Sequence, residues 1–107
     1  MIIKFLISKL IIIFFISISH SKEIKISSES LLIDRENNIS TFSGSVYVEE
    51  KDMEIWADKL VIKLNIDTDE IEEIYAQNNV KIIRENIMAT GEIGFYYPFI
   101  DEVRIIE

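Results

Sequence analysis

The sequence has little of the chemistry that most enzymes use. Its 107 residues include no cysteine, one proline, three glycines and a single histidine, His20. Without cysteine the chain forms no disulfide and has no thiol nucleophile. Beyond residue 20 it also lacks the imidazole that binds most transition metals and serves most catalytic triads. We therefore expect no catalytic site, no metal and no cofactor.

Basic side chains are also scarce. Lysine and arginine total 11 against 19 aspartate and glutamate residues, so the formal net charge is −8. No basic stripe is present to displace counterions from phosphates, which argues against nucleic acid and against binding to anionic membrane surfaces through charge. An anionic lipid would have to be held mainly through its apolar part.

The first 21 residues form a separate segment. Lys4 and Lys9 precede an apolar run from Leu10 to Ile18, and small residues stand at Ser19 and Ser21, the two positions that a signal peptidase reads. This pattern predicts a helical signal peptide over 1–21, with an uncleaved membrane anchor as the alternative. Removing 21 residues leaves 86, with 9 basic and 19 acidic side chains and a net charge of −10. We expect residues 22–107 to form one small exported domain.

No stretch of 22–107 has a sustained helical period, whereas alternation of apolar and polar residues is frequent. We therefore predict strands with one apolar face and one solvent-exposed face. The repeated alternation is seen best in two rows: Phe42, Gly44, Val46 and Val48, and Ile74, Ala76, Asn78, Val80 and Ile82.

The chain also repeats itself. Ile26-Ser-Ser-Glu-Ser-Leu-Leu-Ile33 returns as Ile55-Trp-Ala-Asp-Lys-Leu-Val-Ile62, and each copy is followed by a similar strand, first Gly44-Ser-Val-Tyr-Val48 and then Asn78-Asn-Val-Lys-Ile82. A weaker third copy includes Gly91. A period of roughly 30 residues indicates stacked units that bury one continuous apolar face.

The alternation of apolar and polar residues shifts by one position inside each copy, at Asp58-Lys59 and between Ser28 and Leu31. We interpret the slip as a β-bulge or sharp bend that lets the strands curl into a rolled or sandwich-like sheet. Turn-forming residues separate the expected strands. They are Asn37-Asn38, 49–52, 65–69, 84–86 and Pro98.

Other candidate sites are weaker. Asp58 with Glu92 would make a carboxylate pair, but acidic residues are frequent enough for chance to explain them. The acidic run 67–73 lacks the glycine of a calcium loop and is better explained as a solvated turn. Trp56 and the aromatics of 95–99 could contact a ligand, although ordinary packing is favoured. The inward aliphatic row offers a trough for hydrocarbon, since each buried CH₂ gains about 0.8 kcal/mol.

These repeats, behind a signal peptide, resemble the LptA/OstA-like family of periplasmic lipopolysaccharide-transport proteins. Asn78 stands where the family usually has glycine, and the chain is shorter than typical members. The resemblance implies an open, twisted antiparallel β-jellyroll, all-β, whose interior receives the acyl chains of lipid A. It also implies head-to-tail joining of sheet edges, between copies and with an inner-membrane LptC-like subunit and an outer-membrane LptD-like translocon.

On this basis we expect a lipopolysaccharide carrier in the periplasm, with no enzymatic activity and no nucleic-acid partner. The alternatives are an LptC-like subunit anchored in the inner membrane and a β-sheet docking module that binds no lipid; an enzyme is more remote. The open edge expected at the C-terminus comprises Val103, Arg104 and Ile105. The residues expected to contact lipid are Ile26, Leu31, Ile33, Phe42, Val46, Val48, Ile55, Leu60, Ile62, Ile74, Val80, Ile82 and Phe95.

Overall fold

The computed structural model describes the backbone of residues 2–6, 12–18, 22–50 and 52–107, and the side chains of 24–50 and 52–107. Every regular element in these ranges is a strand, and all pairings are antiparallel, as the sequence predicts. No helix in the described residues is long and apolar enough to cross a membrane. The strands are β1 (Ile2–Leu6), β2 (Ile12–Ile18), β3 (Lys22–Ser28), β4 (Ser30–Asp34), β5 (Ile39–Glu50), β6 (Met53–Leu64), β7 (Ile71–Arg84), β8 (Ile87–Tyr97) and β9 (Glu102–Ile106).

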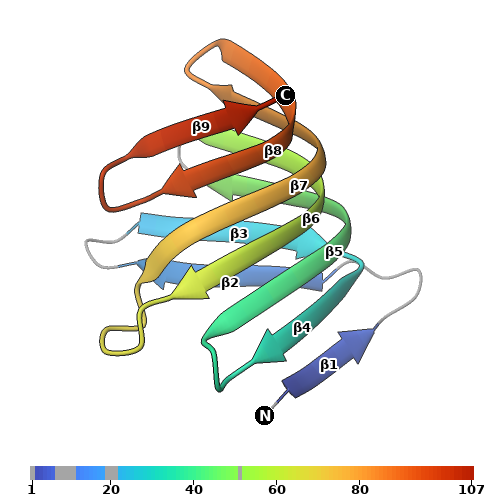
Figure 1. Cartoon of the computed structure of the whole chain (residues 1–107), viewed down its shortest axis with the longest axis vertical. Helices are drawn as coiled ribbons and strands as arrows, with labels where there is room; N and C mark the ends of the chain where they lie inside the picture. Colours follow the sequence, from blue (N-terminus) through green and yellow to red (C-terminus); the bar gives the residue numbers. More distant parts are fainter. Residues whose placement is uncertain (1, 7–11, 19–21, 51) are drawn as a thin grey trace.

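The long strands bend near their middle, so that one sheet forms two facing layers (Figure 1). The first half of β5 pairs with β4, and its second half pairs with β3. β6 and β7 bend in the same way. The second half of β8 pairs with β9, and its first half lies in the same layer as β3. We name the layers by their strands: layer A holds β1, β4 and β9, and layer B holds β2 and β3.

A shift in strand register marks each bend. The shifts fall between Ser43 and Val46 in β5, between Trp56 and Lys59 in β6, and between Gln77 and Val80 in β7. β3 and β4 are likewise separated by a single residue, Glu29, between Ser28 and Ser30. The predicted bulges are therefore confirmed. They are what turns a flat ribbon into a folded sheet.

Left-handed backbone occurs at the bends of β5 and β7. Gly44 has φ +85° and Ser45 has φ +45° in β5, and in β7 the corresponding positions are Asn78 at +67° and Asn79 at +53°. Asparagine tolerates this region better than most residues, so it replaces the glycine of the earlier repeat at moderate cost. The Asn79 side chain also donates a hydrogen bond to Asp58 across the bend, at 2.8 Å.

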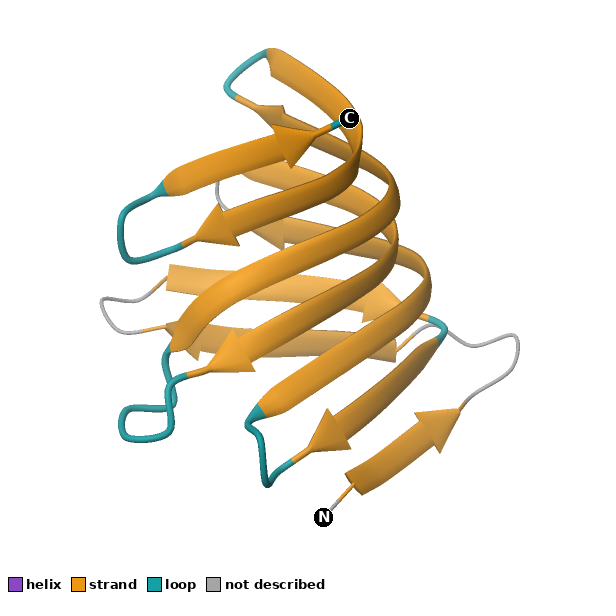
Figure 2. Ribbon diagram, viewed as in Figure 1, coloured by secondary structure: helices purple, strands orange, loops and turns teal. Residues whose placement is uncertain are grey.

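The turns lie on the side of the molecule opposite the bends (Figure 2). Lys51 of the predicted turn 49–52 lies outside the described residues. The other predicted turn residues lie in or beside the turns that join the strands, and Pro98 starts the turn between β8 and β9. Asp34 closes the β4–β5 turn by accepting hydrogen bonds from the backbone of Glu36 and from the backbone and side chain of Asn37. These bonds, the Asn37 side chain first, lower the pKa of Asp34.

The secondary structure of the predicted signal peptide differs from the expected helix. Where the sequence predicts a helix within 1–21, the structure has β1 paired with β4 and β2 paired with β3. Residues 1, 7–11 and 19–21 of that segment lie outside the described residues. The run is rich in isoleucine and phenylalanine, which fit a strand at an open sheet edge as readily as a helix. Removal of the segment stays a prediction.

Candidate functional site: the apolar interior

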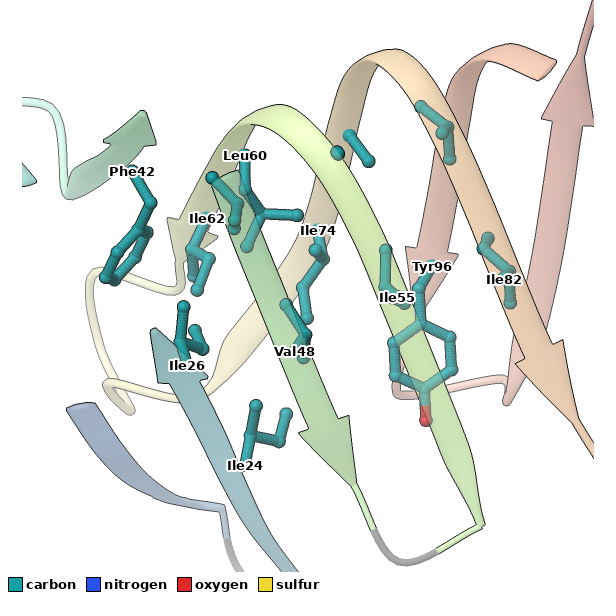
Figure 3. Packing of buried hydrophobic residues seen from close by; sticks show 14 of the residues in the cluster. Ile24, Ile26, Phe42, Val48, Ile55, Leu60, Ile62, Ile74, Ile82 and Tyr96 are labelled. Atoms are coloured by element: carbon teal, nitrogen blue, oxygen red, sulfur yellow. The ribbon is translucent and has the colours of Figure 1, made fainter. Parts of the chain in front are cut away.

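The facing surfaces of the two layers form one apolar interior (Figure 3). Eleven of the thirteen residues predicted to line it are buried there, with 0–4% of their surface exposed. Ile33 is partly buried and packs against the same cluster. The buried eleven are Ile26, Leu31, Phe42, Val46, Val48, Ile55, Leu60, Ile62, Ile74, Val80 and Ile82.

Strand register places these side chains in rows that run across the strands. One row in layer A passes through Leu31, Phe42, Leu60, Ala76, Gly94 and Ile105, each paired with the next. A row in layer B passes through Ile26, Val48, Ile55, Ile82 and Ala89. Residues paired directly across strands share a face of the sheet. The interior is therefore a continuous apolar strip along the direction in which the strands stack.

Phe95 is the one predicted lining residue that the structure places elsewhere. It pairs with Tyr75, and the two rings lie 5.0 Å apart on the outer face of layer A. Its neighbour Tyr96 points inward and is 2% exposed. The prediction for Phe95 was wrong because three aromatics follow one another at 95–97, so alternation alone does not say which of them faces the core.

Six further interior residues were missed. Ala76 already stood in the alternating row with Ile74 but was not counted as a lining residue. Ile24, Met53 and Ala57 continue the alternation of residues already assigned, so extending the same rows would have found them. Ile71 could not be found this way, since the ladder shifts again between Lys63 and Leu64. Tyr96 could be assigned to the interior only once the register between β7 and β8 was known.

Gly94 lies inside the apolar strip and is also required by packing. A Cβ atom at this position would stand 2.9 Å from Cγ1 of Val80 and 3.4 Å from Cδ1 of Ile82. The valine therefore fills the space above the glycine, and the interior is packed rather than hollow at this point. Any occupant of the interior has to displace such contacts.

Polar atoms enter the interior on the turn side. Glu50, at the end of β5 in layer B, is 9% exposed, and its carboxylate lies close enough to the hydroxyl of Tyr96 from layer A to raise the pKa of that phenol. The Tyr96 hydroxyl also lies 3.4 Å from Asp101, and Asp101 in turn pairs with Arg84 at 2.6 Å. Burial, and then the charge of Glu50, raise the pKa of Tyr96, so the phenol stays protonated near neutral pH.

The remaining aromatics lie on the two outer faces and do not form a single cluster. On layer B, Trp56 packs against Tyr47 with ring centroids 5.2 Å apart, and the Lys81 ammonium lies 4.7 Å from the indole. Tyr47 donates a hydrogen bond to Glu54, and this bond raises its pKa. On layer A, Phe95 stacks on Tyr97. Trp56 thus packs with its sheet neighbours and apart from the aromatics of 95–97.

The predicted edge residues lie in β9, which pairs only with β8 among the described strands. Val103 and Ile105 pack against the interior cluster, whereas the side chain of Arg104 is 62% exposed. The far side of β9 is an open edge of layer A, and its backbone groups are available for pairing. Gly91 allows β9 to lie close, since a Cβ there would stand 2.7 Å from the Ile106 carbonyl oxygen.

The weaker candidate sites gain no support. Asp58 is tied to Asn79 at the bend and is exposed. The acidic run begins in a turn that the Asn65 side chain caps by accepting hydrogen bonds from the backbone of Asp67 and Thr68. Within the described ranges no three histidine, cysteine, aspartate or glutamate side chains gather as a metal site would require.

A repeated, bent antiparallel sheet with one apolar inner face is therefore in place, and the sequence comparison agrees with it. Residues 25–107 match the family described as LptA/(LptD N-terminal domain) LPS transport protein. The chain belongs to this family. Its members are lipopolysaccharide-transport proteins, so the resemblance noted from the repeats is confirmed.

The solved structures that are similar to the chain include one from this transport system. It is LptH from Pseudomonas aeruginosa, described as the LptA-homologous periplasmic component of the conserved lipopolysaccharide transport device. The two sequences are 12% identical, the alignment covers 77% of this chain and 80% of LptH, and the TM-score is 0.43. No curated protein matches the sequence significantly.

Proposed function

We propose that this protein is a periplasmic lipopolysaccharide carrier, which shields the acyl chains of lipid A between its two layers and helps to move the lipid from the inner to the outer membrane. The observation that carries the proposal is the continuous apolar strip across the strands, from Leu31 in β4 to Ile105 in β9. Membership of a lipopolysaccharide-transport family gives the class of ligand.

The energetics suit a carrier. Burying a CH₂ group stabilises it by about 0.8 kcal/mol relative to water, in a protein interior or in a bilayer alike. Transfer of an acyl chain between membrane and interior is then close to neutral, so the lipid is neither trapped in the protein nor lost to water. The net charge of −8 leaves the acyl chains as the main part of the lipid that the protein attracts.

The open edge of β9 supports a bridging role. Backbone groups on its far side meet no described strand, and such an edge is a template for a strand from another chain. We propose that this edge and the opposite end of the sheet join further copies of the protein, the inner-membrane LptC-like subunit and the outer-membrane LptD-like translocon. The apolar strips of successive proteins would then be continuous.

The experiment that tests lipid binding uses two neighbouring positions on β5. Val46 faces the interior and is 2% exposed, whereas Tyr47 lies on the outer face against Trp56. A photoreactive amino acid is placed at each position in turn in living cells. We expect lipopolysaccharide adducts at position 46 and not at 47, because only the first faces the strip. Adducts at neither position, in a folded and exported protein, contradict the carrier proposal and favour a docking module that binds no lipid.

A second candidate keeps β3 to β9 and uses the segment 1–21 for membrane attachment instead of strands. The apolar segment 1–21 would anchor the protein in the inner membrane if it were retained, as in an LptC-like subunit. The mass of the protein purified from cells separates the two, because cleavage after Ser21 removes 21 residues. A full-length, membrane-bound product favours the anchored subunit over the carrier.

A further inference from the structure

The interior of this structure is closed to solvent. The apolar side chains of the cluster are at most 5% exposed, and Gly94 is covered by Val80. An acyl chain therefore has to separate the two layers somewhere. On the bend side, β5, β6 and β7 pass from one layer to the other as continuous backbone, so separation there would require the strands themselves to be pulled straight (Figure 1).

The opposite side has no such continuity. There the strands of each layer end in turns (Figure 2). A side-chain ion pair joins the two layers across this side. Arg84, the last residue of β7 in layer B, reaches Asp101 in the β8–β9 turn of layer A, with both carboxylate oxygens 2.6 Å from Nη2. The two residues are 17 positions apart in the chain.

A second contact lies just inside the first. The hydroxyl of Tyr96, from β8 in layer A, meets Glu50 at the end of β5 in layer B and also approaches Asp101. Figure 3 shows the Tyr96 hydroxyl directed away from the labelled aliphatic side chains, toward the end of β5. We call the four residues Arg84, Asp101, Tyr96 and Glu50 the lateral latch. Its outer ion pair is 28% and 54% exposed, and exposed ion pairs contribute little to stability.

We propose that the lateral latch is the gate through which acyl chains pass sideways between the layers. The inference rests on the proposed carrier function and adds the place of access. Opening the latch breaks one exposed ion pair and the contact of one phenol with Glu50, and it displaces apolar side chains packed in the interior. Opening the bend side would in addition require the continuous strands to be pulled straight. Lipid thus reaches the strip from the turn side, and the sheet keeps its strand pairing.

The test fixes the latch with a reversible cross-link. The chain has no cysteine, so the double variant R84C/D101C carries the only two thiols. A bis-methanethiosulfonate reagent of Arg side-chain length joins them, and reductant releases them. The matched control is K63C/E73C, which joins paired positions of β6 and β7 within layer A and leaves the latch intact. The measurement is the rate at which each full-length protein takes up fluorescent lipopolysaccharide.

We expect cross-linked R84C/D101C to take up lipid at least tenfold more slowly than the cross-linked control, with recovery after reduction. The milder variant Asp101→Asn keeps the turn and weakens the ion pair, and should speed uptake by up to about fivefold. Equal uptake by the two cross-linked proteins overturns the gate while leaving lipid binding intact. Failure of the wild type to take up lipid overturns both the gate and the carrier proposal.

Discussion

Leu60→Ala tests whether the apolar strip determines the stability of the fold. Leu60 is fully buried on β6 and lies between Phe42 and Ala76 in its row. The substitution removes three carbon atoms from a site flanked on one side by the small Ala76, which cannot fill the gap. The transfer loss is about 2.4 kcal/mol at 0.8 per carbon, and the residual cavity brings the total to about 3 kcal/mol.

That loss is large for a domain of this size. A stability of 0.05–0.15 kcal/mol per residue gives roughly 4–13 kcal/mol for 86 residues. The assay is urea unfolding followed by the fluorescence of Trp56, the single tryptophan, which lies on the outer face and away from the substitution. With a slope of about 1–1.5 kcal/mol per M urea, the midpoint should fall by about 2–3 M.

The control is Val61→Ala, the next residue on the same strand, which faces outward and pairs with Thr41 and Tyr75. It should cost about 0.5 kcal/mol, since surface substitutions have small effects. A cost below about 1 kcal/mol for Leu60→Ala, or an equal cost for Val61→Ala, would refute the assignment of the interior face. If the strip binds lipid, lipopolysaccharide at 100 times its Kd should restore about 2.7 kcal/mol to the Leu60→Ala protein.

Three other substitutions probe the bend, the packing and a turn. Asn78→Val places a β-branched residue at φ +67° and should cost about 1–3 kcal/mol in urea unfolding, whereas Asn78→Gly should cost little. Gly94→Val drives a side chain into Val80 and should lower stability by about 1–3 kcal/mol; a melting temperature equal to that of the wild type would contradict the packing. Asp34→Asn removes the charged acceptor whose pKa is lowered mainly by Asn37. Since a lowered folded pKa stabilises above the unfolded value of 3.8, the wild type should be more stable than this variant at pH 7, and the difference should shrink below about pH 4. A difference that is constant down to pH 2 would argue against it.

The sequence correctly predicts which side chains point into the interior wherever a strand is regular between two bends. Val46 and Val48, or Leu60 and Ile62, were placed correctly because alternation and the repeated slip together give the inward side. Phe95 was placed wrongly because the pairing of β7 with β8, which decides among the three aromatics, is a property of the assembled sheet.

The lateral latch could not be predicted from the sequence, for the same physical reason. Glu50 and Tyr96 are 46 positions apart in the chain and meet only because the two layers face each other. The form of the segment 1–21 was also open, since an apolar run rich in isoleucine suits a helix in a membrane and a strand at a sheet edge. Local pattern therefore predicts the lining of the interior, and the contacts across it require the fold.

The bend in every long strand sets how such a protein can change in length. Each hairpin supplies a piece of both walls, so one more hairpin would extend the interior by two strand spacings, about 10 Å, and leave its width unchanged. Its cross-section is fixed by where Gly44 and Asn78 fall along their strands, and its span by the number of repeats. The length of the apolar interior is then set by the number of repeats, which duplication or loss of a repeat can adjust without changing either layer.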